Sequence, residues 1–389
     1  MRLSSRAFCG FVVLAAFGAA AAIGCGRLAE EGEPAGNADA GAKILSGDAG
    51  APSIDTSDAA TLESVLATGL AQPLSLTVVG DKLFWIEQHD SGGRIRSVGV
   101  AGGTPISITS FTDLDVNLAS DGTSLYFTRL PDRQAVLPIW AIMKCDLDGT
   151  NVTTITQGTL TPSENFGNGN GLFIVNGTLY LAAAPVGEAI SGLTSVTQAG
   201  VVTALPAVAP GGISYLSWAD ETGLYFWDNG GDGGAPAFAR SPLAGTDVGV
   251  WAVNAGFEDG SYAFVNGDVY VALNNNADAP ETPITTITKI TAGAGAGVDA
   301  TLLVSLSNWT GTSISIAADT NGMFITRGGN LGVGAALPGI YSVSMTTGAT
   351  TLVQVDPSAT AEGLVLDAKN VYWFEQAFTD RAILHATAR

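Results

Sequence analysis

Acidic and amide side chains stand close together in the segment "DNGGDGGAP" (228–236). Asp228, Asn229 and Asp232 supply carboxylate and amide oxygens, which are the ligands that Ca²⁺ prefers in proteins. The four glycines make this segment looser than a simple turn requires. We therefore treat calcium as a candidate cofactor bound by these three residues, with a solvated loop as the alternative interpretation.

A second segment, "DLDGTN" (146–151), has a similar spacing of oxygen atoms. It lacks the distal glutamate that completes a calcium-binding loop of the helix–loop–helix type. Its Asp-Gly pair supplies the positive φ angle that a tight hairpin turn needs. We interpret this segment as a turn.

Further carboxylates and amides lie in segments that separate the apolar runs of the chain. If these segments meet in space, they could bind a cation, a sugar or a peptide, with aromatic side chains as apolar platforms. The alternative is that they are ordinary polar loops. The residues predicted to bind a ligand are Asp115, Asn117, Asn168, Asn170, Glu258, Asp259, Trp309 and Glu362.

Signatures of common enzymes are absent from the sequence. It contains no G-x-S-x-G elbow, phosphate-binding loop, dinucleotide fingerprint or zinc-binding helix. His89 and His385 are the only histidines, which leaves little room for catalysis by histidine. We expect a protein that is not an enzyme, and a carboxylate- or calcium-dependent hydrolase or lyase is the alternative.

The first 24 residues have the pattern of a secretion signal. Arg2 and Arg6 precede an apolar, alanine-rich run that ends in "AAIGC", and no acidic residue occurs before Glu30. The small residues before Cys25 resemble the lipobox of bacterial lipoproteins, in which this cysteine is lipidated and becomes the first residue of the mature chain. By the same resemblance, Gly26 implies sorting to the outer membrane. We expect an exported protein anchored by lipid at Cys25, on the periplasmic side or at the cell surface; an ordinary signal peptide is the alternative.

Residues 25–60 are expected to form a tether. They are rich in Ala, Gly and acidic residues, and they cannot bury enough apolar surface to offset the entropy of ordering. Removal of Arg2 and Arg6 with the signal changes the formal net charge from −20 to −22. This charge argues against a nucleic-acid partner and against attachment to anionic lipid, and it favours a monomer.

Residues 61–389 contain one motif seven times, an apolar residue followed by an aromatic one. Successive copies start 42, 54, 45, 45, 54 and 48 residues apart. Each copy follows a turn signal and is flanked by further apolar runs, which predicts four antiparallel strands per unit, as in a β-propeller blade. The copies are "LFWIEQ" (83–88), "LYFTRL" (125–130), "LYLAAA" (179–184), "LYFWDN" (224–229), "VYVALN" (269–274), "MFITRG" (323–328) and "VYWFEQ" (371–376).

The ends of the repeat complement each other. The seventh unit stops after its third strand, and an unpaired run, "LESVLAT" (62–68), precedes the first unit. This run can complete the last blade and remove an exposed sheet edge. We predict an all-β fold, a seven-bladed propeller closed by an N-terminal strand, with six or eight blades as alternatives. Segments 83–88 and 371–376 then become neighbours, and their aromatic side chains pack between blades.

The units resemble those of the YWTD and TolB-like β-propellers. "LYF" and "VYWF" stand where that family has "LYWTD" on its second strand, and "IMKCDLDGTNVTTI" (142–155) resembles its third-strand hairpin. The Asp of the YWTD box is missing from most copies, although Thr128 and Asp228 keep parts of it. The resemblance covers nearly all of residues 62–389. It implies the fold and names no ligand.

We expect from these observations a lipid-anchored, extracytoplasmic propeller that binds or scaffolds a protein, peptide or glycan partner at the cell envelope. The predicted ligand-binding residues would lie at one mouth of the propeller channel. A purely structural component of the envelope is a further alternative.

Overall fold

The computed structural model divides the chain into two units, Met1–Ile54 and Asp55–Arg389. The structure describes residues 64–89, 92–130, 140–158, 160–162, 171–185, 192–206, 213–228, 237–246, 249–253, 261–274, 284–291, 299–307, 315–327, 338–355, 361–375 and 382–389. The predicted signal segment, Cys25 and the tether lie outside the described residues. No helix in the described part of the chain has the length and apolar character needed to cross a membrane.

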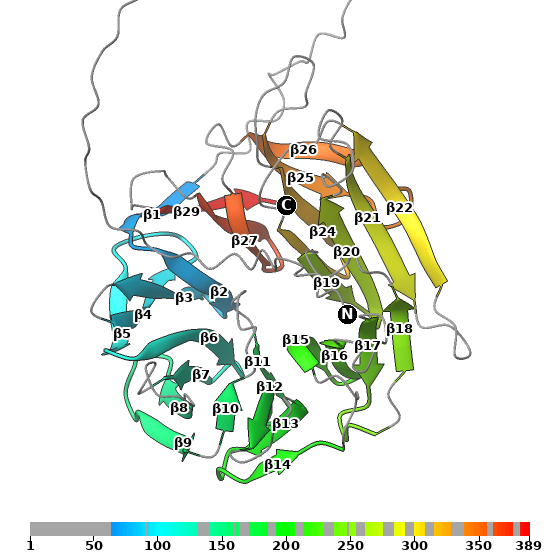
Figure 1. Ribbon diagram of the computed structural model, residues 1–389. Coiled ribbons are helices and arrows are strands. Elements are labelled where there is room, and N and C mark those ends of the chain that lie inside the picture. Colours follow the sequence, from blue (N-terminus) through cyan, green and yellow to red (C-terminus); the bar gives the residue numbers. More distant parts are fainter. Residues whose placement is uncertain are drawn as a thin grey trace, which may run out of the picture. The chain divides into compact units, whose positions relative to one another are not determined.

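The described residues of the second unit form seven antiparallel sheets, which we call blades 1 to 7 in chain order (Figure 1). Within each blade the strands are named first to fourth, and the first strand faces the axis of the ring. Blades 1 to 3 consist of β2 (Pro73–Val79), β3 (Lys82–His89), β4 (Gly92–Gly99) and β5 (Ile106–Phe111); β6 (Leu114–Ser120), β7 (Ser124–Arg129), β8 (Ala141–Asp146) and β9 (Thr153–Gln157); and β10 (Leu160–Pro162), β11 (Leu172–Val175), β12 (Thr178–Pro185), β13 (Gly192–Thr197) and β14 (Val202–Ala204).

Blades 4 to 7 follow the same order. They consist of β15 (Ile213–Asp220), β16 (Gly223–Asp228), β17 (Ala237–Ser241) and β18 (Gly249–Val253); β19 (Ser261–Val265), β20 (Asp268–Asn274), β21 (Ile284–Thr291) and β22 (Asp299–Ser307); β23 (Ile316–Asp319), β24 (Gly322–Arg327), β25 (Gly339–Val343) and β26 (Thr350–Val355); and β27 (Ala361–Leu366), β28 (Asn370–Glu375), β29 (Ala382–Ala388) and β1 (Ser64–Leu70).

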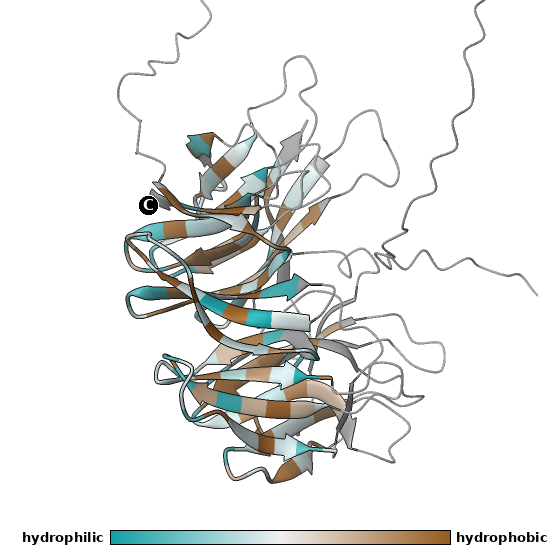
Figure 2. Cartoon of the chain, turned by 90° about the vertical axis from the view of Figure 1, so that its left-hand side faces the viewer, coloured by the Kyte–Doolittle hydropathy of each residue, from teal (hydrophilic) through white to brown (hydrophobic). Residues whose placement is uncertain are grey.

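Seven hydrophobic clusters hold the ring together, one between each pair of neighbouring blades. The second strand of blade 1 contributes to two of them: Leu83 and Trp85 pack toward blade 7, and Phe84 and Ile86 pack toward blade 2. Because both faces of a blade are buried, the second strands are apolar at consecutive positions rather than at alternate ones. Figure 2 shows apolar positions, in brown, recurring along the stacked strands.

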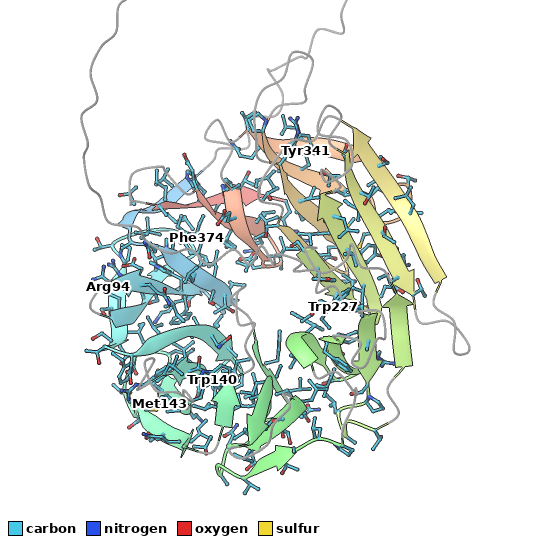
Figure 3. All side chains as sticks on the ribbon, viewed as in Figure 1. Arg94, Trp140, Met143, Trp227, Tyr341 and Phe374 are labelled. Atoms are coloured by element: carbon cyan, nitrogen blue, oxygen red, sulfur yellow. The ribbon has the colours of Figure 1, made fainter. Side chains whose placement is uncertain are left out.

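The ring closes between blades 7 and 1. Strand β1 pairs antiparallel with β29, with Ser64 opposite Ala386, and so completes blade 7. Trp85 and Phe374 meet edge to face across this junction, with ring centroids 6.4 Å apart. Figure 3 shows Phe374 at this position, where blade 7 adjoins blade 1. The predicted seven-bladed propeller closed by an N-terminal strand is therefore confirmed, including the proximity of segments 83–88 and 371–376.

Blade 3 explains one of the two long intervals of the repeat. Its first strand consists of two pieces, β10 and β11, and both pair with β12. Leu160 lies opposite Pro185, and Leu172 lies opposite Leu181, so residues 163–170 are inserted between the two pieces. The insertion lengthens the unit to 54 residues without changing its number of blades.

In blades 2 and 7 the turn between first and second strands is tied to the recurring aromatic residue, which is a tyrosine there. The Tyr126 hydroxyl donates to Asp121 Oδ2 at 2.8 Å, and the Tyr372 hydroxyl donates to Asp367 Oδ2 at 2.6 Å. Each of these rings is also fully buried between blades. The aromatic position thus packs neighbouring blades and anchors the preceding turn.

The segment "DLDGTN" is a hairpin turn between β8 and β9, as interpreted from its sequence. The oxygens of its aspartates bind within the turn: Thr150 donates its backbone N–H to Asp148 Oδ1 at 2.9 Å, and Asn151 donates to Asp146 Oδ2 at 2.7 Å. Cys145, directly before the turn, is buried, and burial together with the nearby Asp146 and Asp148 raises the pKa of its thiol to about 11. Cys145 therefore acts as a small apolar side chain.

Candidate functional site

The two edges of the ring differ in their connections. At one edge, which we call the hairpin edge, turns join first to second strands and third to fourth strands. At the other edge, which we call the loop-bearing edge, first strands begin and second strands end. Connections to the third strands and to the next blade leave from this edge. Of the predicted ligand-binding residues, Asp115, Asn117 and Glu362 belong to described first strands.

Charged side chains recur at one position of the loop-bearing edge. This position is the fifth residue of each repeated motif, at or near the end of the second strand. Blades 6, 7, 1 and 2 are consecutive around the ring, and each carries a charge there. We call these four residues and their partners the charged arc. The fifth residues of blades 1 to 7 are Glu87, Arg129, Ala183, Asp228, Leu273, Arg327 and Glu375.

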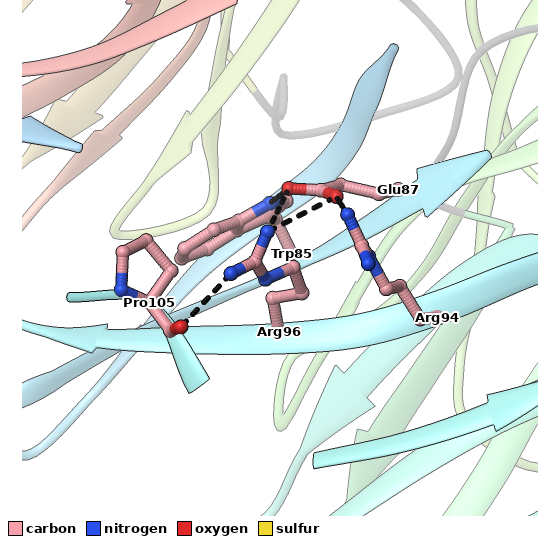
Figure 4. Close-up of polar contacts among 5 residues, drawn as sticks. All are labelled: Trp85, Glu87, Arg94, Arg96 and Pro105. Atoms are coloured by element: carbon pink, nitrogen blue, oxygen red, sulfur yellow. Dashed lines mark hydrogen bonds and ion pairs between the residues drawn. The ribbon is translucent and has the colours of Figure 1, made fainter. Parts of the chain in front are cut away.

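Glu87 of blade 1 is fully buried and is held by three side chains (Figure 4). Trp85 Nε1 donates to Oε1 at 3.1 Å, and Arg94 donates to Oε2 through Nε at 2.8 Å and Nη2 at 2.6 Å. Arg96 Nη1 donates at 3.3 Å, while its Nη2 donates to the Pro105 carbonyl at 2.8 Å. Two guanidinium groups thus surround one carboxylate. The Arg94 side chain remains 36% exposed, so its outer N–H groups face solvent.

Arg129 of blade 2 is fixed by a two-point ion pair. Its Nε and Nη2 donate to the two oxygens of Asp113 at 2.7 and 2.8 Å. The guanidinium also lies over the Phe111 ring, 4.4 Å from its centroid. Asp113 and Phe111 stand at the link from blade 1 to blade 2, so this contact fixes the link as well as the charge.

Glu375 of blade 7 stands beside a histidine. His385 Nε2 lies 2.7 Å from Glu375 Oε2, and the imidazole stacks on Trp373 with centroids 5.3 Å apart. His385 lies opposite Trp373 in the sheet, just as Arg96 lies opposite Trp85 in blade 1. Blades 7 and 1 therefore repeat one arrangement, in which a basic residue on the third strand contacts the fifth-position glutamate.

Arg327 of blade 6 is almost completely buried. Burial lowers the pKa of its guanidinium, and hydrogen bonding to Tyr341 opposes that change. Burial likewise raises the pKa of the Tyr341 hydroxyl. The surroundings of Arg327 therefore disfavour its charge overall, and the contact with Tyr341 offsets only part of the cost of burial.

Small polar residues tie together the first strands of three pairs of neighbouring blades. Asn117 Oδ1 accepts the Gly171 N–H at 2.9 Å, Ser261 Oγ accepts the Ile316 N–H at 3.2 Å, and Ser315 Oγ accepts the Leu364 N–H at 3.0 Å. Each bond runs from one blade to the next. They satisfy backbone donors on the axial side of the sheets, which have no neighbouring strand.

Asn117 was predicted to bind a ligand, but in the structure its amide group forms hydrogen bonds within the protein. It is fully buried, and its Nδ2 donates to Thr128 Oγ1 at 3.1 Å in addition to the bond with Gly171. Among the other predicted residues, Glu362 is partly buried on β27, and Asp115 and Asp228 lie on β6 and β16. Those outside the described residues are Asn168, Asn170, Asn229, Asp232, Glu258, Asp259 and Trp309.

No group of three or more His, Cys, Asp or Glu side chains within the described ranges is arranged to bind a metal ion. Of the three residues predicted to bind calcium, Asn229 and Asp232 lie outside those ranges. The charged arc consists of guanidinium and carboxylate groups that neighbouring side chains orient. Arg94 and Arg129 of this arc keep exposed surface.

Several residues of the charged arc were missed in the sequence. Arg129 and Arg327 stand at the fifth position of their motif copies but were not singled out as site residues. Arg94 and Arg96 belong to no copy of the motif. The partner arginines lie on a third strand, and their contact with Glu87 depends on the register in which Glu87 faces Arg94.

The described residues define the chain as a seven-bladed β-propeller. No protein family and no curated protein matches its sequence. Among solved structures it is similar to an oligogalacturonate lyase of Vibrio parahaemolyticus, with a TM-score of 0.57 and 11% identity over 84% of this chain and 93% of that chain. TolB of Acinetobacter baumannii has a TM-score of 0.40 and 11% identity over 80% of this chain and 65% of that one. A nidogen/laminin complex has a TM-score of 0.39 and 14% identity over 68% and 89%. At these identities the similarity concerns the fold.

Proposed function

We propose that this chain is an extracytoplasmic binding module, anchored by lipid at Cys25 to the outer membrane, that engages its partner at the charged arc. The observation that carries the proposal is the fifth-position charge in four consecutive blades. In blades 7, 1 and 2 this charge is oriented by an ionic or polar neighbour. Charges fixed in advance lose little entropy when a partner binds them.

The partner class that we propose is a peptide or protein segment with charges of both signs. Glu87 and Arg327 are buried. The groups of the arc that a partner can reach are the Glu375 carboxylate and the Arg94 and Arg129 guanidinium groups, which carry charges of both signs. Complementary patterns of charge give specificity and fast association rather than great affinity.

The N-terminal pattern and the repeats support two finer assignments. The run "AAIGC" that ends at Cys25 supports a lipoprotein, and the recurring aromatic motif supports a place among the YWTD and TolB-like propellers. The anchor is tested by Cys25→Ser in the producing bacterium. We expect the variant to move from the membrane fraction to the soluble fraction. Continued membrane association of the variant would refute lipidation.

The charged arc is tested by quantitative co-purification from crosslinked envelopes. The test variant combines Arg94→Ala, Arg129→Ala and Glu375→Gln. The control is Lys144→Ala, because Lys144 lies on a third strand near the hairpin edge and contacts Gln198. We expect the amount of at least one co-purified partner to fall roughly tenfold or more with the test variant and to stay unchanged with the control. A purely structural role predicts the same set of partners for both variants.

A carboxylate-dependent lyase or hydrolase is the second candidate, because the Glu375–His385 pair is a possible acid–base couple. One of the similar solved structures is that of an oligogalacturonate lyase, an enzyme named for its action on oligogalacturonate. Purified chain incubated with oligogalacturonate would then produce unsaturated products that absorb ultraviolet light, and Glu375→Gln would abolish them. No absorbance change with the wild-type chain argues against this lyase activity.

A further inference from the structure

Trp218 is an exception among the tryptophans whose side chains the structure describes. Trp85, Trp140, Trp227 and Trp373 are fully or almost fully buried, whereas Trp218 is 37% exposed. The other exposed large apolar residues lie on or beside fourth strands at the rim of the ring, as Val201 does beside β14. Trp218 instead lies on β15, the first strand of blade 4, which faces the axis (Figure 1).

The Trp218 ring contacts the blades on both sides of its own. It stacks on Phe264 of blade 5 with centroids 5.3 Å apart and an interplanar angle of 5°. It meets Phe173 of blade 3 edge to face, with centroids 5.7 Å apart. A side chain confined to one interface between blades cannot reach both neighbours, so Trp218 projects on the axial side of β15.

Two features fix the orientation of this ring. The pairing of β15 with β16 shifts register between Leu216 and Trp218, and such bulges re-aim the following side chain. The indole Nε1 then donates to Asp220 Oδ2 at 3.2 Å. Phe173, Trp218 and Phe264 all lie within three residues of a turn of the hairpin edge. They therefore form an aromatic cluster at the hairpin edge, opposite the charged arc.

We propose that Trp218 is a stacking platform for a pyranose ring of a neutral glycan. The C–H groups of a sugar ring carry partial positive charge and pack on the electron-rich face of an indole. The neighbouring turns of blades 3 and 5 expose Asn176 and Asn266, whose amides can exchange hydrogen bonds with sugar hydroxyls. Asp220 supplies a carboxylate acceptor beside the indole. This site is independent of the proposed function, because no residue of the charged arc takes part.

The test uses the full chain with three neutral tetrasaccharides, chitotetraose, cellotetraose and mannotetraose, measured by calorimetry. The variants are Trp218→Ala and Trp218→Phe, with Val201→Ala as the exposed apolar control. We expect one tetrasaccharide to bind with one-to-one stoichiometry and Trp218→Ala to weaken it at least about tenfold. Trp218→Phe should fall between Trp218→Ala and the wild type, and Val201→Ala should leave binding unchanged.

A second measurement covers the case in which Trp218→Ala fails to fold. Wild-type chain is oxidised with N-bromosuccinimide, with and without the tetrasaccharide, and oxidation of the Trp218 peptide is followed by mass spectrometry. Protection of Trp218 supports the proposal. Equal oxidation with and without the tetrasaccharide overturns it, as does the absence of binding by all three tetrasaccharides. Binding of choline in place of a saccharide overturns it as well, because the platform would then serve a cation.

Discussion

Glu87 and Glu375 show how one repeat position acquires different properties. Both are the fifth residue of nearly identical motifs on second strands. Glu87 is completely buried between two arginines, whereas the Glu375 side chain is 20% exposed and contacts one histidine. Glu87 is therefore held by two guanidinium groups out of contact with solvent, whereas Glu375 keeps part of its surface in solvent.

Loss of the two carboxylates should have unequal effects on stability. Glu87→Gln leaves the Arg94 and Arg96 guanidinium groups without a counter-charge, and we expect a loss of about 3 kcal/mol in the free energy of unfolding. Glu375→Gln should cost less than about 1 kcal/mol, because the Glu375 side chain is partly exposed and contacts a single basic side chain. Urea unfolding at neutral pH measures both. Equal losses would contradict this view of the two sites.

Asp121 makes the stability of the turn between β6 and β7 depend on pH. Burial alone would raise its pKa, but hydrogen bonds from Thr123, Tyr126 and Ser124 outweigh burial and lower the pKa to about 2. The folded state therefore gains stability from the ionised carboxylate above its ordinary pKa of about 4. This gain is lost as the pH falls from about 4 through 2.

The comparison of Asp121→Asn with the wild type tests this dependence. At pH 7 the variant should melt at a lower temperature, and the difference should vanish near pH 2. Because Asp121 is exposed to solvent, we expect no more than about 1 kcal/mol at pH 7. Asp81→Asn in blade 1 is the matched control, since its second-strand aromatic is Phe84, which has no hydroxyl. A melting difference that persists unchanged at pH 2 would contradict the assignment.

At the scale of the element, the turns between third and fourth strands show how neighbouring blades approach each other. Gly149 has a φ of +83°, and a Cβ there would lie 2.1 Å from the Ile108 carbonyl oxygen of blade 1. A Cβ added to Gly200 would lie 2.3 Å from the Ile155 carbonyl oxygen of blade 2. A Cβ added to Gly348 would lie 2.4 Å from the Leu303 carbonyl oxygen of blade 5. These turns therefore seat directly on the outer strand of the preceding blade.

Substitution of Gly149 separates backbone strain from contact between blades. Gly122 is the control, because it has a φ of +88° with nothing within 4 Å of its would-be Cβ. Gly122→Ala should cost about 1 kcal/mol for the left-handed conformation alone. Gly149→Ala should cost at least about 2 kcal/mol more, because the methyl group meets backbone that cannot rotate away. If chemical denaturation showed equal losses in the free energy of unfolding for the two variants, the turn would not be in tight contact with blade 1.

The sequence predicted the turn at Gly149 but not this role. Asp-Gly within "DLDGTN" indicates a hairpin, because glycine preferences are local. Contact with Ile108 depends on how blade 2 sits against blade 1, which no local pattern encodes. Asn117 is a second example. Its polar character was evident from the sequence, but its hydrogen bond with Gly171 of the next blade could not be predicted from it.

At the scale of the whole molecule, seven clusters and one donated strand account for the closed ring. The number of blades could be predicted because each unit repeats an aromatic motif after a turn signal, and because "LESVLAT" complements the incomplete seventh unit. The split first strand of blade 3 could not, because the insertion at 163–170 looks like a connection between units. The charged arc was half predictable: Arg327 and Glu375 stand in copies of the repeated motif, while the contact of Arg94 with Glu87 depends on strand register.

Closure by β1 makes a prediction for the stability of the ring. Leu70 is fully buried where β1 joins blades 7 and 1, and Val65 of the same strand is 55% exposed. Leu70→Ala should lower the free energy of unfolding by about 3 kcal/mol, and Val65→Ala should change it by less than about 0.5 kcal/mol. Thermal and urea unfolding of both variants provide the measurement. A near-neutral Leu70→Ala would indicate that β1 does not contribute to the stability of the ring.

The central claim is that the partner binds at the loop-bearing edge of blades 6, 7, 1 and 2. The most direct measurement places a photo-crosslinking amino acid at the position of Arg94 in one variant and of Lys144 in another, in intact cells. Crosslinked products are then identified by mass spectrometry. We predict a discrete partner adduct from position 94 and none from position 144. Adducts from position 144 alone, or none from position 94, would contradict the claim.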